Sequence, residues 1–175
     1  LAMPTGGLIS INHKNHKQFR KTLLARRWCG ITDRIDSEYD VKELGWNYYM
    51  NEFSAVIGLT QLKKLDKLNN IRKNIAKFYD KQIDADHKTA FNEDCSYHLY
   101  WILVKNRKKF REKMEQVGIE TGTHYKPIHT MEMYQNHKIL PNTEKIGKQI
   151  VTIPIHPNLT TVERDKIVNS INKFI

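Results

Sequence analysis

Two clusters of polar and aromatic residues in this sequence have the composition of ligand-binding sites. The first, Gly45 to Glu52, places three aromatic side chains and two amides directly before a long segment with helical periodicity. Because the first N–H groups of a helix have no partner within it, such a helix start can bind an anion, for example a phosphate. The aromatic residues could instead pack around the helix start, with Asn51 as its cap. The composition leaves both interpretations open.

The second cluster is the turn from Thr123 to His129, which carries several polar or ionisable side chains and is held by Pro127. It follows a predicted strand, and turns at the carboxyl end of a strand commonly line ligand clefts. The alternative is a surface turn whose histidine and lysine side chains are solvated. The residue types alone do not decide between a cleft and a surface turn.

Other kinds of chemistry find little support in the spacing of the residues. His13 and His16 lie three positions apart, with no cysteine or acid at ligand spacing beside them, so no metal site is expected. Thr5-Gly6-Gly7 precedes a predicted strand and lacks the Gly-Lys-Ser/Thr sequence of a P-loop. No nucleophile has a base at a convincing spacing, and no pair of acids stands out.

The composition indicates one globular domain. With 175 residues, of which 39% are hydrophobic and 27% charged, the chain can bury a core, and no apolar run could span a bilayer. Cys29 and Cys95 belong to no paired motif, so we expect a soluble protein of the reducing cytoplasm without a membrane partner. The formal charge of +10 suits an anionic partner. Much of this excess lies on the polar side of one predicted helix, which favours an ordinary solvated face.

The periodicity of apolar residues predicts the elements that position the two clusters. The longest pattern runs from Asn51 to Ile83, where apolar residues recur at intervals of three and four and predict one long helix, or two helices with a bend. Residues 33–45 show no period and are expected to form a loop. The other expected elements are strands at 8–11, 97–104 and 119–125 and helices at 14–27, 107–117 and 161–174.

Three local signals mark the ends of the predicted helices. Gly118 is the expected left-handed terminator of the helix at 107–117. Thr160 and Glu163 have the spacing of a capping box, which starts the last helix. That last helix is expected to bury four apolar side chains, which are Val162, Ile167, Ile171 and Phe174.

Five pieces of the sequence occur together in an order that is typical of one enzyme family. They are PTGGLISIN, GWNYYMNEFSAVIGLTQLKKL, RKNIAKFY, THYKPIH and TIPIHPNLT. Their order and spacing resemble those of the DegT class (DegT/StrS type) of PLP-dependent nucleotide-sugar aminotransferases. The resemblance covers essentially all 175 residues.

The resemblance implies an α/β fold, namely the C-terminal portion of an aspartate-aminotransferase-type (fold type I) PLP enzyme. Residues 1–50 would end the large PLP-binding domain, 51–85 would form a long connecting helix, and 86–175 would form a small C-terminal α/β domain. Gly6-Gly7 matches the glycine pair that follows the family's Schiff-base lysine. We therefore expect that lysine just upstream of Leu1, no catalytic residue within this chain, and no activity from the segment alone.

The activity that the resemblance implies is transfer of an amino group to a nucleotide-linked keto-deoxysugar. The amino donor is an amino acid, usually glutamate in this family, the cofactor is pyridoxal 5'-phosphate, and the enzyme is a homodimer. Such reactions serve surface-polysaccharide or amino-sugar biosynthesis. The sequence does not choose among UDP, dTDP and GDP, or among the positions of the sugar.

The resemblance also assigns roles to five residues of this chain. Asn47 matches the asparagine that reaches the cofactor phosphate of the other subunit, and Tyr49 stands beside it where many members carry arginine. His124 matches a histidine that faces the sugar nucleotide. Tyr125 and His129 are its neighbours in the same turn and are further substrate-binding candidates.

Two other classes of protein remain as alternatives. A basic nucleic-acid-binding module would interleave aromatic residues with lysine and arginine on one surface. Most aromatic residues here fall on apolar faces or in the Gly45 to Glu52 cluster, so no nucleic-acid partner is expected. If the molecule truly begins at Leu1, it would be a non-catalytic small domain that offers only a surface for a partner.

Overall fold

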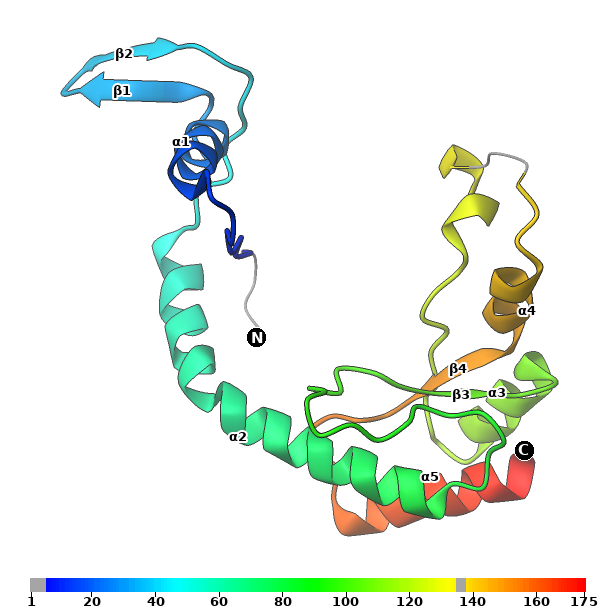
Figure 1. The fold of residues 1–175 in the computed structure, drawn as a ribbon. Coiled ribbons are helices and arrows are strands. Elements are labelled where there is room, and N and C mark those ends of the chain that lie inside the picture. The colour runs from blue at the N-terminus through cyan, green and yellow to red at the C-terminus, as the bar shows by residue number, and fades with distance from the viewer. Residues whose placement is uncertain (1–5, 135–137) are drawn as a thin grey trace. The chain divides into compact units, whose positions relative to one another are not determined.

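The structure, a computed structural model, describes residues 6–134 and 138–175. The chain forms two compact units, Leu1–Leu65 and Asp66–Ile175. Helix α2, Glu52–Gln82, begins in the first unit and ends in the second (Figure 1).

The first unit contains helix α1, His16–Arg27, and an antiparallel hairpin of β1, Ile31–Ile35, with β2, Glu38–Val41. The helix was predicted from sequence and is confirmed. The strand expected at 8–11 is wrong, because this segment pairs with no strand among the described residues. Leu8 is 91% exposed and Ile9 is 69% exposed, so the short apolar run gains little from burial within this unit.

The hairpin replaces the loop expected at 33–45, so that prediction is also wrong. Its two strands are joined through Asp36 and Ser37, with Ile35 paired to Glu38. Asp36 has φ of 51°, and Asp33 has φ of 53° where the register shifts between Thr32 and Ile35. Aspartate tolerates this left-handed region better than most residues, which allows both the tight turn and the irregularity.

Helix α2 is a single helix of 31 residues, as one of the two predicted forms required. The Asn51 side chain accepts a hydrogen bond from the Ser54 N–H at 2.8 Å, so Asn51 caps this helix, as one of the two interpretations left open by the sequence held. Only the second half of the apolar stripe is buried, with Ile75 and Tyr79 in the core of the second unit. The first half is exposed at Phe53, Val56, Ile57, Leu59 and Leu62.

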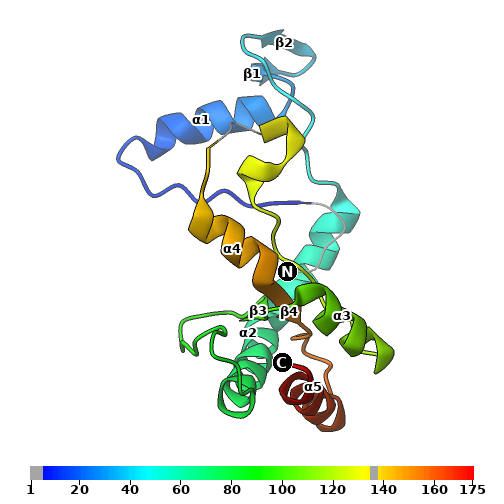
Figure 2. The ribbon, with the colours of Figure 1, turned by 90° about the vertical axis from the view of Figure 1, so that its right-hand side faces the viewer.

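The second unit is built on two antiparallel strands, β3, Tyr100–Leu103, and β4, Ile150–Ile153, with Tyr100 opposite Ile153. The C-terminal half of α2 and helix α5, Thr161–Phe174, lie side by side along this pair, where Asn172 bonds the Gln82 carbonyl at 2.8 Å (Figures 1 and 2). The remaining helices are α3, Arg107–Gln116, α4, Pro141–Gln149, and the short 3-10 turns η1, Ile128–Thr130, and η2, Glu132–Tyr134.

Several sequence predictions for this unit are confirmed. The strand expected at 97–104 is present in shorter form as β3. Helix α3 ends before Gly118, which has φ of 74° as expected for a left-handed terminator. The capping box of α5 is complete, because Thr160 accepts from the Glu163 N–H and the Glu163 carboxylate accepts from the Thr160 N–H.

Other predictions for this unit are wrong. The strand expected at 119–125 is reduced to one isolated pair, Gly122 with Thr152 on β4, in which both backbone N···O distances are 2.9 Å. Val162 was expected to be buried but is 77% exposed, because it lies in the first turn of α5, while Ile167 and Ile171 are buried. Helix α4 and strand β4 were not predicted.

Candidate functional site

The first cluster lines a pocket of about 450 Å³ within the first unit. The structure brings Asn47 and Tyr49, the two predicted cofactor residues, together with Gly6-Gly7 at this pocket. The remaining lining residues are Arg27, Tyr48 and Met50. No acidic residue from the described part of the chain lines it, so its charge favours an anion.

Asn47 is held by the end of helix α1. It forms an isolated antiparallel bridge with Trp28, and the Tyr48 N–H donates to the Arg27 carbonyl at 2.9 Å. The Asn47 Oδ1 atom accepts from the Tyr49 N–H at 3.3 Å. Among residues 6–134 and 138–175 no acceptor is bonded to the Asn47 Nδ2 group, which is therefore left to donate to a ligand.

Arg27 is a pocket residue that sequence reasoning missed. Its guanidinium carbon lies 4.6 Å from the centre of the Tyr49 ring, in cation–π geometry. Arg27 and Tyr49 are far apart in the sequence and share no recognisable spacing, so only the fold brings them together. A guanidinium and an amide at one pocket are donors that fit the oxygens of a phosphate group.

The second cluster contributes to a cleft of about 500 Å³ within the second unit. Of the three predicted substrate residues, His124 lines this cleft. Sequence reasoning missed the other polar groups of its wall. The lining residues are Arg72, His98, Leu99, Glu120, Thr121, Gly122, His124, Thr152, Ile153, Pro154, Ile155 and His156.

Within the described part of the chain, one arginine, three histidines and the carboxylate of Glu120 line this cleft. Arg72 comes from helix α2, whereas His156 follows strand β4, so residues that are distant in sequence meet here. Such a wall supplies several hydrogen-bond donors for the oxygens of a ligand, with Arg72 as the donor suited to an anionic group.

His124 is fixed at the wall of the cleft by strand β4. Its Nδ1 atom lies 2.7 Å from the hydroxyl oxygen of Thr152, which is only 4% exposed. The Tyr125 ring meets the His124 ring edge-on, with centroids 4.8 Å apart and planes at 87°. The imidazole is therefore held from two sides.

Tyr125 and His129 do not line the cleft with His124. The side chain of Tyr125 is 68% exposed. His129 lies 3.2 Å from a carboxylate oxygen of Glu144 on helix α4, and its side chain is 10% exposed. The pKa of Glu144 lies below its ordinary value because hydrogen bonds stabilise the charged carboxylate. The larger effect comes from the Leu140 N–H and the smaller one from the His129 side chain. In this structure His129 therefore links η1 to helix α4.

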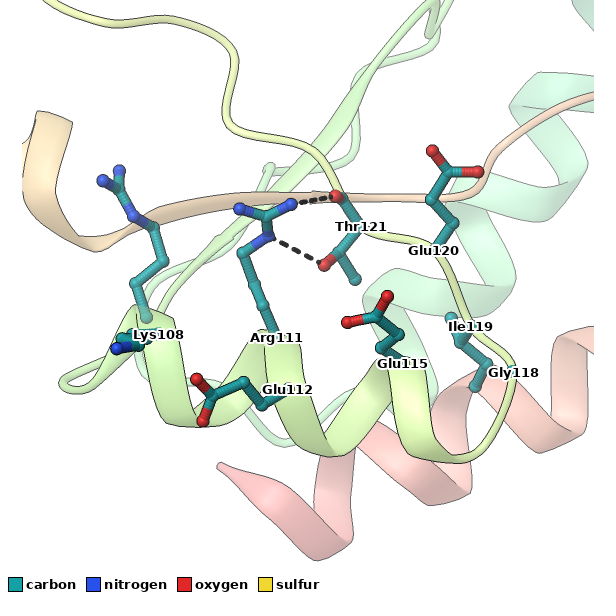
Figure 3. Close-up of a pocket in the computed structure, with 9 residues that line it drawn as sticks. Lys108, Arg111, Glu112, Glu115, Gly118, Ile119, Glu120 and Thr121 are labelled. Atoms are coloured by element: carbon teal, nitrogen blue, oxygen red, sulfur yellow. Dashed lines mark hydrogen bonds between the residues drawn. The ribbon is translucent and has the colours of Figure 1, made fainter.

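A larger pocket, of about 720 Å³, lies between helix α3 and the segment at 118–121 that follows it (Figure 3). Its charges are mixed, because Arg107, Lys108 and Arg111 face three glutamates. Figure 3 shows the Arg111 guanidinium directed at Thr121, to which it donates hydrogen bonds of 3.0 and 3.2 Å. Arg111 thus fixes the segment that leads into Gly122 and His124.

Comparison with known proteins defines the family. The model of the DegT/DnrJ/EryC1/StrS aminotransferase family matches residues 1–172. The chain belongs to this family. Members of the family are sugar aminotransferases that use PLP.

Solved structures of family members share the fold of this chain. PseC from Helicobacter pylori, an aminotransferase involved in the biosynthesis of pseudoaminic acid, is 30% identical with a TM-score of 0.79 over 87% of this chain and 44% of its own. The sugar aminotransferase CalS13 from Micromonospora echinospora is 28% identical with a TM-score of 0.76 over 86% and 43%. The putative sugar aminotransferase Spr1654 from Streptococcus pneumoniae, in its PLP form, is 24% identical with a TM-score of 0.82 over 91% and 44%.

The chain therefore spans less than half the length of these relatives, and its α/β fold corresponds to their C-terminal portion. Within the described residues, no helix combines the length and apolar character that crossing a membrane requires. The same part of the chain holds no group of three or more metal-ligating side chains.

Proposed function

We propose that this chain is the C-terminal part of a PLP-dependent aminotransferase that moves an amino group from an amino acid, glutamate, to a nucleotide-linked keto-deoxysugar. The observation that carries this proposal is the cleft around His124, which is rich in hydrogen-bond donors. A nucleotide sugar carries a diphosphate, and the cleft offers a guanidinium and three imidazoles that can donate hydrogen bonds to its oxygens. The catalytic lysine belongs to the upstream half of the longer polypeptide.

Within the cleft, some side chains bind the diphosphate and another orients the sugar. Arg72, His98 and His156 bind the anionic diphosphate, while His124 contacts the sugar. Among the described residues, the Arg72 Nη1 atom donates one long bond of 3.4 Å, to Asn69, which leaves the guanidinium able to turn toward a phosphate oxygen. Binding through the diphosphate holds the ketone still, and such positioning accelerates a reaction between bound groups.

The pocket at Asn47 serves the cofactor. PLP, when bound, supplies the electron sink that allows an amino group to move between donor and acceptor. Asn47 and Arg27 would hold its phosphate by donating hydrogen bonds, in a homodimer whose other subunit would hold the rest of the cofactor. Arg27 stacks on Tyr49, so a guanidinium is present beside the position where many family members carry arginine.

The setting of the reaction is surface-polysaccharide or amino-sugar biosynthesis in the cytoplasm. The family membership supports a role in sugar biosynthesis. Cys29 and Cys95 are free thiols, which is compatible with a reducing compartment.

The test is amino transfer by the complete enzyme, with PLP, glutamate and matched keto-deoxysugars linked to UDP, dTDP or GDP. Mass spectrometry of the sugar detects replacement of the ketone by an amine. We expect amination of at least one of the three. The same keto-deoxysugar without its nucleotide is the control, and it should react far more slowly because it lacks the diphosphate.

Two results would contradict the proposal. One is conversion of the cofactor by glutamate with no amination of any of the three nucleotide sugars. The other is equal amination with and without the nucleotide, which would mean that the cleft binds no diphosphate.

A further inference from the structure

Gly122, His124 and Thr152 form a compact unit at the wall of the cleft. Gly122 and Thr152 are paired through two backbone hydrogen bonds of 2.9 Å, and His124 follows Gly122 by two residues. The pairing sets the Thr152 hydroxyl beside the imidazole, where its oxygen lies 2.7 Å from Nδ1. The position of the ring therefore depends on strand β4 as well as on its own turn.

The direction of this hydrogen bond follows from the burial of Thr152. Its hydroxyl is in a residue only 4% exposed, and no second partner for it exists among residues 6–134 and 138–175. If the Nδ1–H group donated, the hydroxyl hydrogen would be buried without an acceptor, which is costly. If the hydroxyl donates to Nδ1, both groups are satisfied. The neutral imidazole then carries its proton on Nε2.

Gly122 leaves the space that this arrangement needs. A Cβ atom at position 122 would lie 2.6 Å from Cε1 of His124 and 2.6 Å from the Thr152 hydroxyl oxygen. It would also lie 2.9 Å from Nδ1 of His124. Any side chain at this position would separate the imidazole from the hydroxyl, so the hydrogen bond requires glycine here.

We propose that Thr152 is a positioning residue that holds neutral His124 with its proton on Nε2, so that His124 donates a hydrogen bond to an oxygen of the nucleotide sugar. The Nε2 atom points away from Thr152 and is the ring nitrogen left for a ligand. The role of the bound oxygen rests on the proposed function, whereas the fixed tautomer does not. His124 is then a donor to the substrate rather than a base toward it.

The first experiment measures the tautomer without any reaction. Long-range proton–nitrogen NMR correlations of the complete enzyme, at a pH where His124 is neutral, distinguish the protonated ring nitrogen from the unprotonated one. We expect Nε2 to be protonated and Nδ1 to be the acceptor. Protonation of Nδ1 in the unsubstituted protein would overturn the proposal, and this result needs no variant to fold.

Two substitutions of Thr152 extend the measurement. Thr152→Val keeps the shape of the side chain and removes the hydroxyl, so His124 should populate both tautomers. Thr152→Ser keeps a hydroxyl and should restore the single tautomer. An unchanged tautomer in Thr152→Val would overturn the proposal, since something other than Thr152 would then fix the ring.

The second experiment follows the two half-reactions of the complete enzyme. Thr152→Val should lower kcat/KM for the nucleotide sugar about tenfold, the size of one well-placed hydrogen bond, and leave the half-reaction with glutamate unchanged. Thr152→Ser should recover most of the loss. Equal slowing of both half-reactions would overturn the positioning role, because a merely structural defect acts on both.

Failure of the proposed function gives a different pattern. If the unsubstituted enzyme aminates no nucleotide sugar, the proposed substrate is wrong, and the NMR result alone decides whether Thr152 positions His124. If the enzyme aminates nucleotide sugars but Thr152→Val reacts normally, the substrate is right and the positioning role is wrong.

Discussion

Tyr79 and Tyr100 are neighbouring buried tyrosines, and we expect their replacement by phenylalanine to change stability in opposite directions. Both are fully buried, and their rings meet edge-on with centroids 5.4 Å apart. The Tyr79 hydroxyl donates to the Pro154 carbonyl at 2.9 Å. In the described part of the chain, the Tyr100 hydroxyl has no hydrogen-bond partner. The two substitutions thus remove the same atom from different surroundings.

The expected magnitudes follow from these surroundings. Tyr79→Phe leaves the Pro154 carbonyl without its donor and should lower the free energy of unfolding by about 1 kcal/mol. Tyr100→Phe removes a buried hydroxyl that gains nothing from the protein, and it should raise the free energy of unfolding by up to about 1 kcal/mol. The two variants should differ by up to about 2 kcal/mol, which is roughly thirtyfold in the opening equilibrium.

Native-state hydrogen exchange is the suitable assay, because the chain has two units and a global melting curve would mix them. The slowest amides of β3 and β4 report opening of the second unit. Equal losses in the two variants would refute the reasoning, as would a larger loss in Tyr100→Phe. Because Pro154 lines the cleft, the result also tests whether Tyr79 ties helix α2 to the cleft wall.

Three further predictions concern the helix cap and the cofactor pocket. Thr160→Ala should destabilise the second unit by about 1 kcal/mol in the same exchange assay, because it removes the α5 cap. The bonds that Glu163 accepts from Thr160 hold the pKa of Glu163 below its ordinary value of 4.5, so their stabilisation is present above that pH and is lost as pH falls through the lower folded value. An acid titration of Glu163→Gln should lack this component. In the complete enzyme, Asn47→Ala should release PLP about tenfold more readily on dialysis and leave the free energy of unfolding unchanged. The control Asn51→Ala removes the α2 cap, so it should lower the free energy of unfolding and leave PLP release unchanged.

The elements that sequence predicted correctly have local causes. The cap at Asn51, the terminator Gly118 and the Thr160–Glu163 box each depend on residues within a few positions of one another. Helix α2 was found because its apolar stripe has the helical period along its whole length. Burial of that stripe was not predictable, because it depends on which other elements reach the helix.

The predictions that failed concern strands, which need partners from elsewhere in the chain. The run from Leu8 to Ile11 has the composition of a strand but pairs with nothing among the described residues. The polar hairpin around Asp36 was missed because its strands are mostly exposed and show no apolar alternation.

The candidate site was predictable only in part, for a similar reason. The turn that carries His124 is recognisable in the sequence, but Thr152 lies 28 residues away on a strand that was not predicted. Arg72 comes from α2 and His156 from the segment that follows β4, and Arg27, at the end of α1, contacts Tyr49 from 22 positions away in the sequence. No spacing pattern in the sequence predicts these contacts, so they are seen only in the folded structure.

Stopped-flow absorbance of the cofactor in the complete enzyme tests the central claim most directly, because it follows the two half-reactions separately. His124→Ala should slow the half-reaction with the nucleotide sugar, or raise the sugar concentration that it requires, and leave the half-reaction with glutamate largely intact. The control His16→Ala, an exposed residue of the first unit, should change neither. Unchanged rates of both half-reactions in His124→Ala would contradict the account, because His124 would then be a surface histidine with no part in binding the sugar.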